Sequence, residues 1–224
     1  MRLNGLIDLS HTIAPGTGNR PLRLERVPPP EFGYFPKDQW YIMHQVGFLN
    51  HLCTHIEVPY HTVEQGQDLS GVPLDRLCGE AVILDLTSVA PGSAVTPSAI
   101  QGAAERAGGV REGDIVFCRF DFDRHFDRQD RPKAPHFTSE AVEWLVGRGM
   151  KLMGVDTGGI ELPPEDPRAA RQHNHHLLMD RGIPLIENLA HLGRLTRPRV
   201  TVFAFPVAVE RLDAFPVRVV ALQD

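Results

Sequence analysis

Four side chains of the kind that bind metal ions recur at odd-numbered positions within one eleven-residue segment, HLCTHIEVPYH. They are His51, His55, Glu57 and His61. Residues two apart project from the same face of an extended strand, so all four would point the same way. A helix would separate Glu57 from the histidines and would not accommodate Pro59. The pattern therefore predicts an extended segment with one polar face. The residues that would face the core are Leu52, Ile56 and Val58.

This polar face favours a divalent metal ion. With 11 histidines in 224 residues, such a segment would hold about half a histidine by chance (11 × 11/224), and it holds three. Imidazole nitrogens and a carboxylate suit zinc or manganese. The alternative is a polar strand with surface or hydrogen-bonded histidines. Cys53 shares the parity and is either a soft extra ligand or a side chain that fills space beside the metal.

A second group of candidate ligands lies near the end of the chain, in HNHHLLMDRGIPLIENL. Its members are His173, His175, His176 and Glu187. A short helix ending at Gly182 and the strand after it would bring His175 and Glu187 together. A carboxylate in an apolar strand is costly unless it is paired or metal-bound. The alternative is a salt-bridged Glu187 beside a solvated histidine run.

Composition excludes several classes of protein. Lys+Arg 23 against Asp+Glu 28 gives a net charge of −5, which argues against a nucleic-acid partner. Three cysteines without a CxxC pair predict neither a disulfide framework nor a thiolate zinc site, and they favour the cytoplasm. The longest apolar run is too short to span a membrane. A length of 224 residues suits a single domain, residues 1–224.

The order of the expected elements predicts a mixed α/β fold with many strands. Strands are expected at 5–13, 40–62, 80–86, 114–120, 152–156, 183–189, 200–209 and 217–222. Helices are expected at 97–106, 138–148 and 173–181, the first beginning with Thr96 as N-cap and Pro97 as its first residue. Residues 14–38 are rich in Pro, Gly and Arg and predict an irregular arm or lid.

Several motifs resemble one known family in the same order along the chain. The segment from His51 to His61 is similar to the signature HxGTHxDxPxH of the cyclase-like metal-dependent hydrolases, whose best-known members are the bacterial kynurenine formamidases. Four further segments are similar to the family's opening strand, GDxV strand, G-x-D-T-x-S loop and H-x₁₁-E segment. They are IDLSH (7–11), EGDIVFCR (112–119), GVDTGGIE (154–161) and HHLLMDRGIPLIENL (175–189).

The resemblance implies a swivelling β/β/α fold, a homodimer or homotetramer, and one or two metal ions. It implies that His51, His55 and the acid at 57 hold the first ion. That acid with His175 and Glu187 would complete a second site. His61 would be the catalytic acid/base. The chain departs from the family pattern at three positions, which are Cys53 for Gly, Glu57 for Asp and Gly159 for Ser.

The predicted activity is metal-assisted hydrolysis of a small aryl-formamide or cyclic amide by an activated water. His61 would move a proton to the leaving nitrogen, because imidazoles titrate near neutral pH. The alternatives are a lactone hydrolase or cyclase on the same site, His61 as a fourth ligand or a hydrogen-bond donor to one, and a non-catalytic metal-binding protein. An aromatic cluster before the histidines would form either a wall for a planar substrate or a core or dimer contact. Its members are Tyr34, Phe35, Trp40 and Tyr41.

Overall fold

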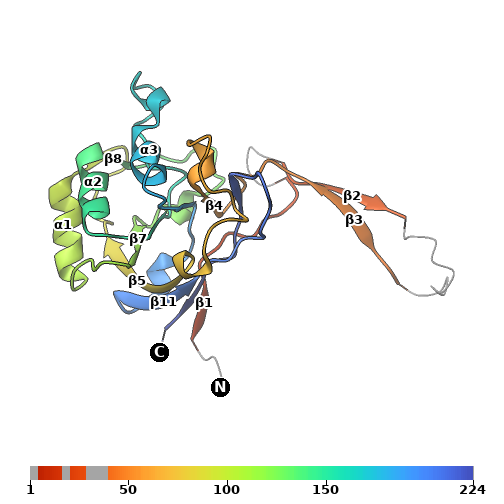
Figure 1. Ribbon diagram of the computed structural model, residues 1–224, viewed down its shortest axis with the longest axis horizontal. Coiled ribbons are helices and arrows are strands. Elements are labelled where there is room, and N and C mark those ends of the chain that lie inside the picture. Colours follow the sequence, from red (N-terminus) through yellow and green to blue (C-terminus); the bar gives the residue numbers. More distant parts are fainter. Residues whose placement is uncertain (1–4, 17–20, 29–39, 224) are drawn as a thin grey trace.

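The computed structural model describes residues 5–16, 21–28 and 40–223. Its centre is a mixed sheet of nine strands in the order β1-β13-β11-β5-β7-β9-β10-β4-β12 (Figure 1). In that order the strands are Leu6–Asp8, Val220–Leu222, Arg199–Phe203, Cys78–Asp85, Ile115–Arg119, Leu152–Val155, Leu185–Glu187, His55–Glu57 and Ala214–Pro216. Strands β5, β7, β9 and β10 are parallel, and the other pairings are antiparallel. The expected α/β class with a mixed sheet is confirmed.

Three α-helices accompany the sheet in the described residues. They are α1 (Pro97–Arg106), α2 (Ser139–Gly147) and α3 (His173–Met179). Helix α1 begins as predicted, since the Thr96 hydroxyl accepts a hydrogen bond from the Ala99 N–H at 3.4 Å and Pro97 is the first helical residue. The smaller elements are the strands β6 (Ala94–Val95) and β8 (His136–Phe137) and the 3₁₀ turns η1 (Pro59–His61), η2 (Leu74–Arg76), η3 (Phe122–His125), η4 (Ala169–Arg171) and η5 (Leu192–Arg194).

The sheet separates two hydrophobic cores. Alternate residues of β5 face opposite sides: Val82 and Leu84 pack with the three helices, whereas Ala81 and Ile83 pack in the second core. The second core also takes residues from β4, β11 and β13, strands far apart in the sheet order, because the sheet curls around it. Burial on both faces explains why β5 has a continuous apolar sequence. In the described part of the chain, no helix combines the length and apolar character needed to span a membrane.

A two-stranded arm, β2 (Arg23–Val27) paired antiparallel with β3 (Met43–Gly47), extends away from the sheet (Figure 1). The sequence predicted an irregular segment at 14–38, and part of it is this strand β2. It also predicted one extended strand over 40–62, which is wrong. That stretch is divided into β3, a turn, β4 and η1, because it leaves the arm and then joins the sheet. Tyr34 and Phe35 of the aromatic cluster lie outside the described residues.

Candidate metal centre

Only two of the four clustered side chains in the 51–61 segment lie on a strand. His55 and Glu57 project from the same face of β4, as the parity predicts. His51 precedes the strand, and the chain turns between them because Cys53 has a left-handed backbone, φ 52°. His61 follows Pro59 in the turn η1. The shared parity of all four residues is therefore not the reason they converge.

The second candidate group is brought to β4 by the pairing of β10. In this antiparallel register Glu187 lies opposite His55, so the two side chains leave the sheet on the same face. His175 comes from α3, with its Nε2 3.2 Å from Glu57 Oε2 and 3.6 Å from Glu187 Oε1. The His175 and Glu187 side chains predicted to converge thus lie beside Glu57. His173 is exposed, and His176 lies 3.9 Å from Asp180, outside this group.

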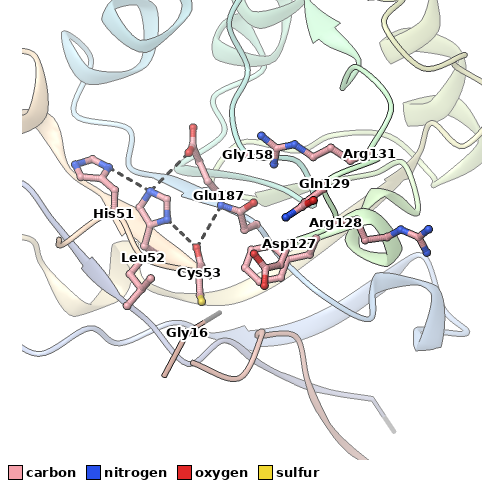
Figure 2. A pocket seen from close by; sticks show the side chains of 13 residues that line it. Gly16, His51, Leu52, Cys53, Asp127, Arg128, Gln129, Arg131, Gly158 and Glu187 are labelled. Atoms are coloured by element: carbon pink, nitrogen blue, oxygen red, sulfur yellow. Dashed lines mark hydrogen bonds and ion pairs between the residues drawn. The ribbon is translucent and has the colours of Figure 1, made fainter. Parts of the chain in front are cut away.

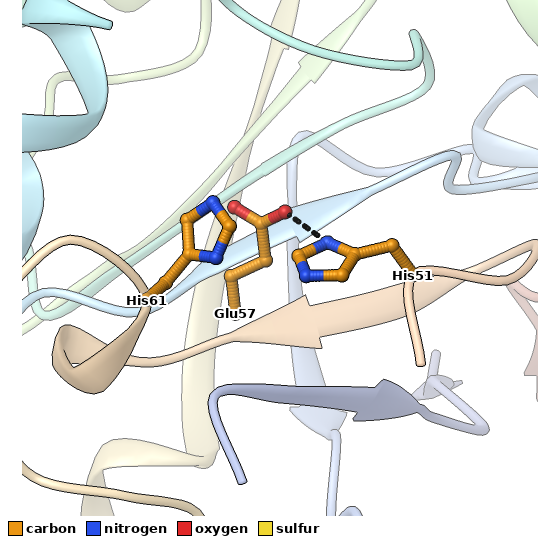
Figure 3. A group of neighbouring side chains, drawn as sticks. All are labelled: His51, Glu57 and His61. Atoms are coloured by element: carbon orange, nitrogen blue, oxygen red, sulfur yellow. Dashed lines mark hydrogen bonds and ion pairs between the residues drawn. The ribbon is translucent and has the colours of Figure 1, made fainter. Parts of the chain in front are cut away.

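The possible ligand atoms form two overlapping sets that share Glu57. One contains His51, Glu57 and His61 (Figure 3), and the other contains His55, Glu57 and Glu187; within each set the atoms lie within 4.8 Å of one another. Further distances are 2.7 Å from His51 Nδ1 to Glu57 Oε1, 3.2 Å from His51 Nδ1 to His55 Nε2, and 3.6 Å from His55 Nε2 to Glu187 Oε2. Glu57 is one of the five metal-ligand residues predicted from sequence, and the other four contact it directly or through one neighbour.

These spacings fit the coordination shell of a divalent ion. Ligands held at about 2.0–2.1 Å around a tetrahedral ion lie about 3.3–3.4 Å from one another. Buried Glu57 Oε2 has no hydrogen-bond partner, although His175 Nε2 is 3.2 Å away. A buried carboxylate oxygen without a hydrogen bond is costly unless a cation occupies the gap. The donor set, the spacing and this orphaned oxygen therefore suit a metal ion.

The charges of the cluster are also set for cation binding. Burial opposes ionisation of Glu57, but the neighbouring imidazoles of His175, His51 and His55 outweigh it and hold its pKa well below the usual range. Burial likewise opposes protonation of His51, yet hydrogen bonds to Asp213 and Glu57 raise its pKa to about 9. Without a metal, protons balance the buried carboxylates, and a divalent ion would replace them.

Three acceptors that fix the imidazole rings were not found from sequence. The Cys53 carbonyl accepts from His55 Nδ1 at 2.9 Å, and Glu161 lies 2.9 Å from His175 Nδ1. Asp213 contacts both His51 Nε2, at 3.0 Å, and His61 Nδ1, at 2.8 Å. Such acceptors orient the second ring nitrogen toward the site. The Asp213 and Glu161 carboxylates stand singly in loops, where no local pattern marks them.

The cluster opens into a cavity of about 600 Å³ (Figure 2). Its metal side contains His51, His55, Glu187 and Asn188, and the opposite side comes from the loop after η3. The Cys53 thiol points away from the histidines, and burial raises its pKa, so its geometry does not support a soft extra ligand. Gly159 replaces the Ser of the resemblance, and a Cβ there would lie 3.4 Å from Glu187 Oε1.

Known proteins resemble this chain in sequence and in fold. A model of the Cyclase family matches residues 7–162. The kynurenine formamidase of Salinibacter ruber is 30% identical over 76% of this chain and 74% of its own length, and that of Paracidovorax citrulli is 28% identical over the same shares. Two solved structures share the fold. Isatin hydrolase A from Labrenzia aggregata bound to benzyl benzoate has a TM-score of 0.80, with 23% identity over 96% of this chain and 92% of its own. Isatin hydrolase A from Ralstonia solanacearum has a TM-score of 0.83, with 23% identity over 98% and 92%.

Proposed function

This chain belongs to the Cyclase family, and on that premise we propose that it is a metal-dependent hydrolase that cleaves the amide C–N bond of a small aryl-formamide or cyclic amide. The observation that carries the proposal is the convergence of histidine nitrogens and carboxylate oxygens around Glu57 at the end of an open cavity. The relatives named for kynurenine formamidase and for isatin hydrolase support an amide as the bond that is cleaved.

We propose that His51, His55, Glu57, His175 and Glu187 hold the metal. A nitrogen and oxygen donor set without a thiolate favours Zn²⁺ or Mn²⁺. One ion would fit the set of His55, Glu57 and Glu187, and a second ion would share Glu57 with His51, where His61 lies beside it. A divalent ion held there lowers the pKa of a water molecule and polarises an acyl oxygen, which is the chemistry that amide hydrolysis requires.

His61 is the proposed acid/base. Its Nδ1 contacts Asp213 at 2.8 Å, so the ring orientation is fixed and Nε2 is left to exchange a proton with the reacting groups. Its side chain is 20% exposed, against 2–3% for His55 and Glu57, and its ring centroid lies 4.7 Å from that of His51, which lines the cavity. An amide needs this proton more than a lactone does, because an amine is a poorer leaving group than an alcohol.

We further propose a homodimer or homotetramer assembled through the arm. The cross-strand pair Leu24 and Val46 is 47% and 52% exposed, and Trp40, against which Arg26 of the same arm packs, is 81% exposed. A two-stranded arm that exposes apolar side chains is marginally stable alone, so a second copy of the chain would stabilise it. The three free cysteines favour the cytoplasm as its location.

The test pairs elemental analysis with hydrolysis assays on an N-formyl aryl amide, a cyclic amide and a lactone. The proposal expects stoichiometric zinc or manganese and turnover of an amide that a chelator abolishes and the metal restores. Turnover of the lactone alone would favour the alternative activity. Stoichiometric metal without hydrolysis of any of the three would favour a non-catalytic binding protein. Light scattering of the purified protein checks the assembly.

A further inference from the structure

The wall of the cavity opposite the metal side is built by one loop. We call residues 121–135 the outer loop. Phe126 stacks on His11 with ring centroids 3.8 Å apart and an interplanar angle of 15°, which anchors the loop on the body of the protein. Phe126, Gln129 and Arg131 then line the cavity. A planar aromatic group and polar side chains therefore face the metal side across the space where a substrate would lie.

The cationic side chains of the outer loop differ in whether they have an ionic partner. Arg128 forms a two-pronged ion pair with Asp130, at 3.0 and 2.9 Å, and Lys133 lies 3.1 Å from Glu165. Arg131 has no hydrogen bond or ion pair with any residue in the described part of the chain. Figure 2 shows its guanidinium directed toward Gly158, across the cavity from the histidines, whereas that of Arg128 points away.

Arg131 also lies at the boundary between two cavities. A second cavity of about 460 Å³ shares Arg131 and Gly158 with the first one, so the guanidinium stands where the two spaces meet. The other charged side chains of the outer loop that line the first cavity are Asp127 and Arg128. Burial raises the pKa of the Cys53 thiol, and the nearby Asp127 carboxylate adds to that rise. The outer loop therefore places its anionic side chain near Cys53 and the guanidinium of Arg131 toward Gly158.

We propose that Arg131 selects amide substrates that carry a carboxylate on an aromatic ring, which it binds while the amide lies at the metal side. The inference rests on the proposed amide hydrolysis and names its substrate class. A guanidinium offers paired N–H donors that match the two oxygens of a carboxylate. The ring between the amide and the carboxylate would lie against Phe126, since aromatic rings attract one another in stacked or tilted arrangements.

The experiment compares kcat/KM for formanilide and for 3- and 4-formamidobenzoate in the metal-loaded protein. Wild type should prefer a formamidobenzoate by about 5- to 30-fold, the range expected for a charge-assisted contact on a partly exposed side chain. Arg131→Met should bring the ratio close to one, mainly by raising KM for the charged substrate. Arg131→Lys should keep part of the preference, because a single ammonium replaces the paired donors. Arg128→Met is the matched control from the same loop and should keep the wild-type ratio.

Each result decides between the two proposals. Equal kcat/KM for neutral and charged amides in wild type, or an unchanged ratio in Arg131→Met, would overturn the role of Arg131 and leave amide hydrolysis standing. If no amide is hydrolysed, the proposed function fails, and calorimetric binding of the same compounds then tests Arg131 separately. Tighter binding of formamidobenzoate than of formanilide, lost in Arg131→Met, would still support it, and equal binding would overturn it. Thermal unfolding of the variants confirms that they are folded.

Discussion

The two walls of the cavity are built in opposite ways. On the metal side His55 and Glu57 are 2–3% exposed, and their positions are fixed by β4, β10 and α3 together. On the other side Arg131 is exposed, and it belongs to one loop that rests on the body through Phe126. In the proposed roles, the residues that hold the metal lie where several elements fix each side chain, whereas the residue that selects a substrate lies where a substitution costs little stability. Five experiments test this contrast.

Removing one buried donor should have the largest effect. His55→Ala should reduce bound metal to background and lower hydrolysis by at least about 10⁴-fold, beyond the upper range for loss of a single acid/base group. Elemental analysis and steady-state kinetics measure both. His173→Ala, an exposed histidine at the start of α3, is the matched control and should keep both metal and rate. Wild-type metal content in His55→Ala would contradict the assignment.

Removing the proton-transfer group should separate metal binding from turnover. His61→Ala should keep the metal and lower kcat on an amide by about 10²–10⁴-fold, since proton transfer belongs to the transition state. An ester with a good leaving group should lose less. Loss of metal in this variant would make His61 a ligand instead, which its place in a ligand set beside His51 and Glu57 allows.

Removing an acceptor that orients the rings should have a smaller effect. Asp213 contacts both His51 and His61, and it carries a carboxylate whose pKa their hydrogen bonds hold far below the usual range. Asp213→Asn should lower metal affinity or kcat by about 10- to 100-fold, the range for groups that support a ligand. Asp75→Asn, at an exposed aspartate outside both cavities, is the control. A wild-type rate and affinity in Asp213→Asn would show that the rings are held by other contacts.

The free energy of unfolding should depend on pH through His11, on which Phe126 of the outer loop stacks. Burial lowers the pKa of His11 to about 4 from an ordinary value of 6.5. The unfolded chain therefore binds the proton first, and His11 contributes stability that is present above about pH 6.5 and is lost as the pH falls toward 4. His11 is partly exposed, so the loss should be about 1 kcal/mol. Urea unfolding with chelator present, at pH 7.5 and 4.5, should show a smaller drop for His11→Gln than for wild type, and equal drops would contradict the argument.

The smallest effect should come from the turn before β4. Cys53 holds φ at 52°, a conformation that costs residues other than Gly, Asn and Asp roughly 1–2 kcal/mol. Gly in its place should stabilise the fold by about 0.5 kcal/mol, after its larger loss of backbone entropy on folding. Cys53→Ala, which removes the thiol but keeps the strain, is the control and should give no gain. A Cys53→Gly protein no more stable than Cys53→Ala would show that the thiol matters more than the backbone.

The sequence predicted the elements whose signals are local. Helix α1 starts and ends as expected because Thr96, Pro97 and Gly108 mark its ends within thirteen residues. His55 and Glu57 share a face because they lie two apart on a real strand. The single strand over 40–62 was wrong because the chain leaves the arm at residue 47 and turns at Cys53, and neither event leaves a pattern in the hydrophobic spacing.

The parts of the site that the sequence did not predict are those that depend on contacts between separate segments of the chain. Asp213 follows His51 by 162 positions, and it reaches the site because β12, directly after it, pairs with β4. Glu161 likewise contacts His175 from a loop fourteen residues away. A single carboxylate in a loop looks the same whether it faces solvent or an imidazole, so only the sheet order assigns its role.

The same sheet order determines when the site can exist during synthesis. Strand β4 has two neighbours, β10 and β12, which begin at Leu185 and Ala214. A ribosome that adds about 5–20 residues per second needs roughly 8–30 seconds to pass from β4 to the end of β12. Until β10 has been made, the His51–His61 segment has neither strand partner, and until β12 has been made it has only one. A nascent chain therefore presents the first of the proposed metal ligands well before it can close the site around them.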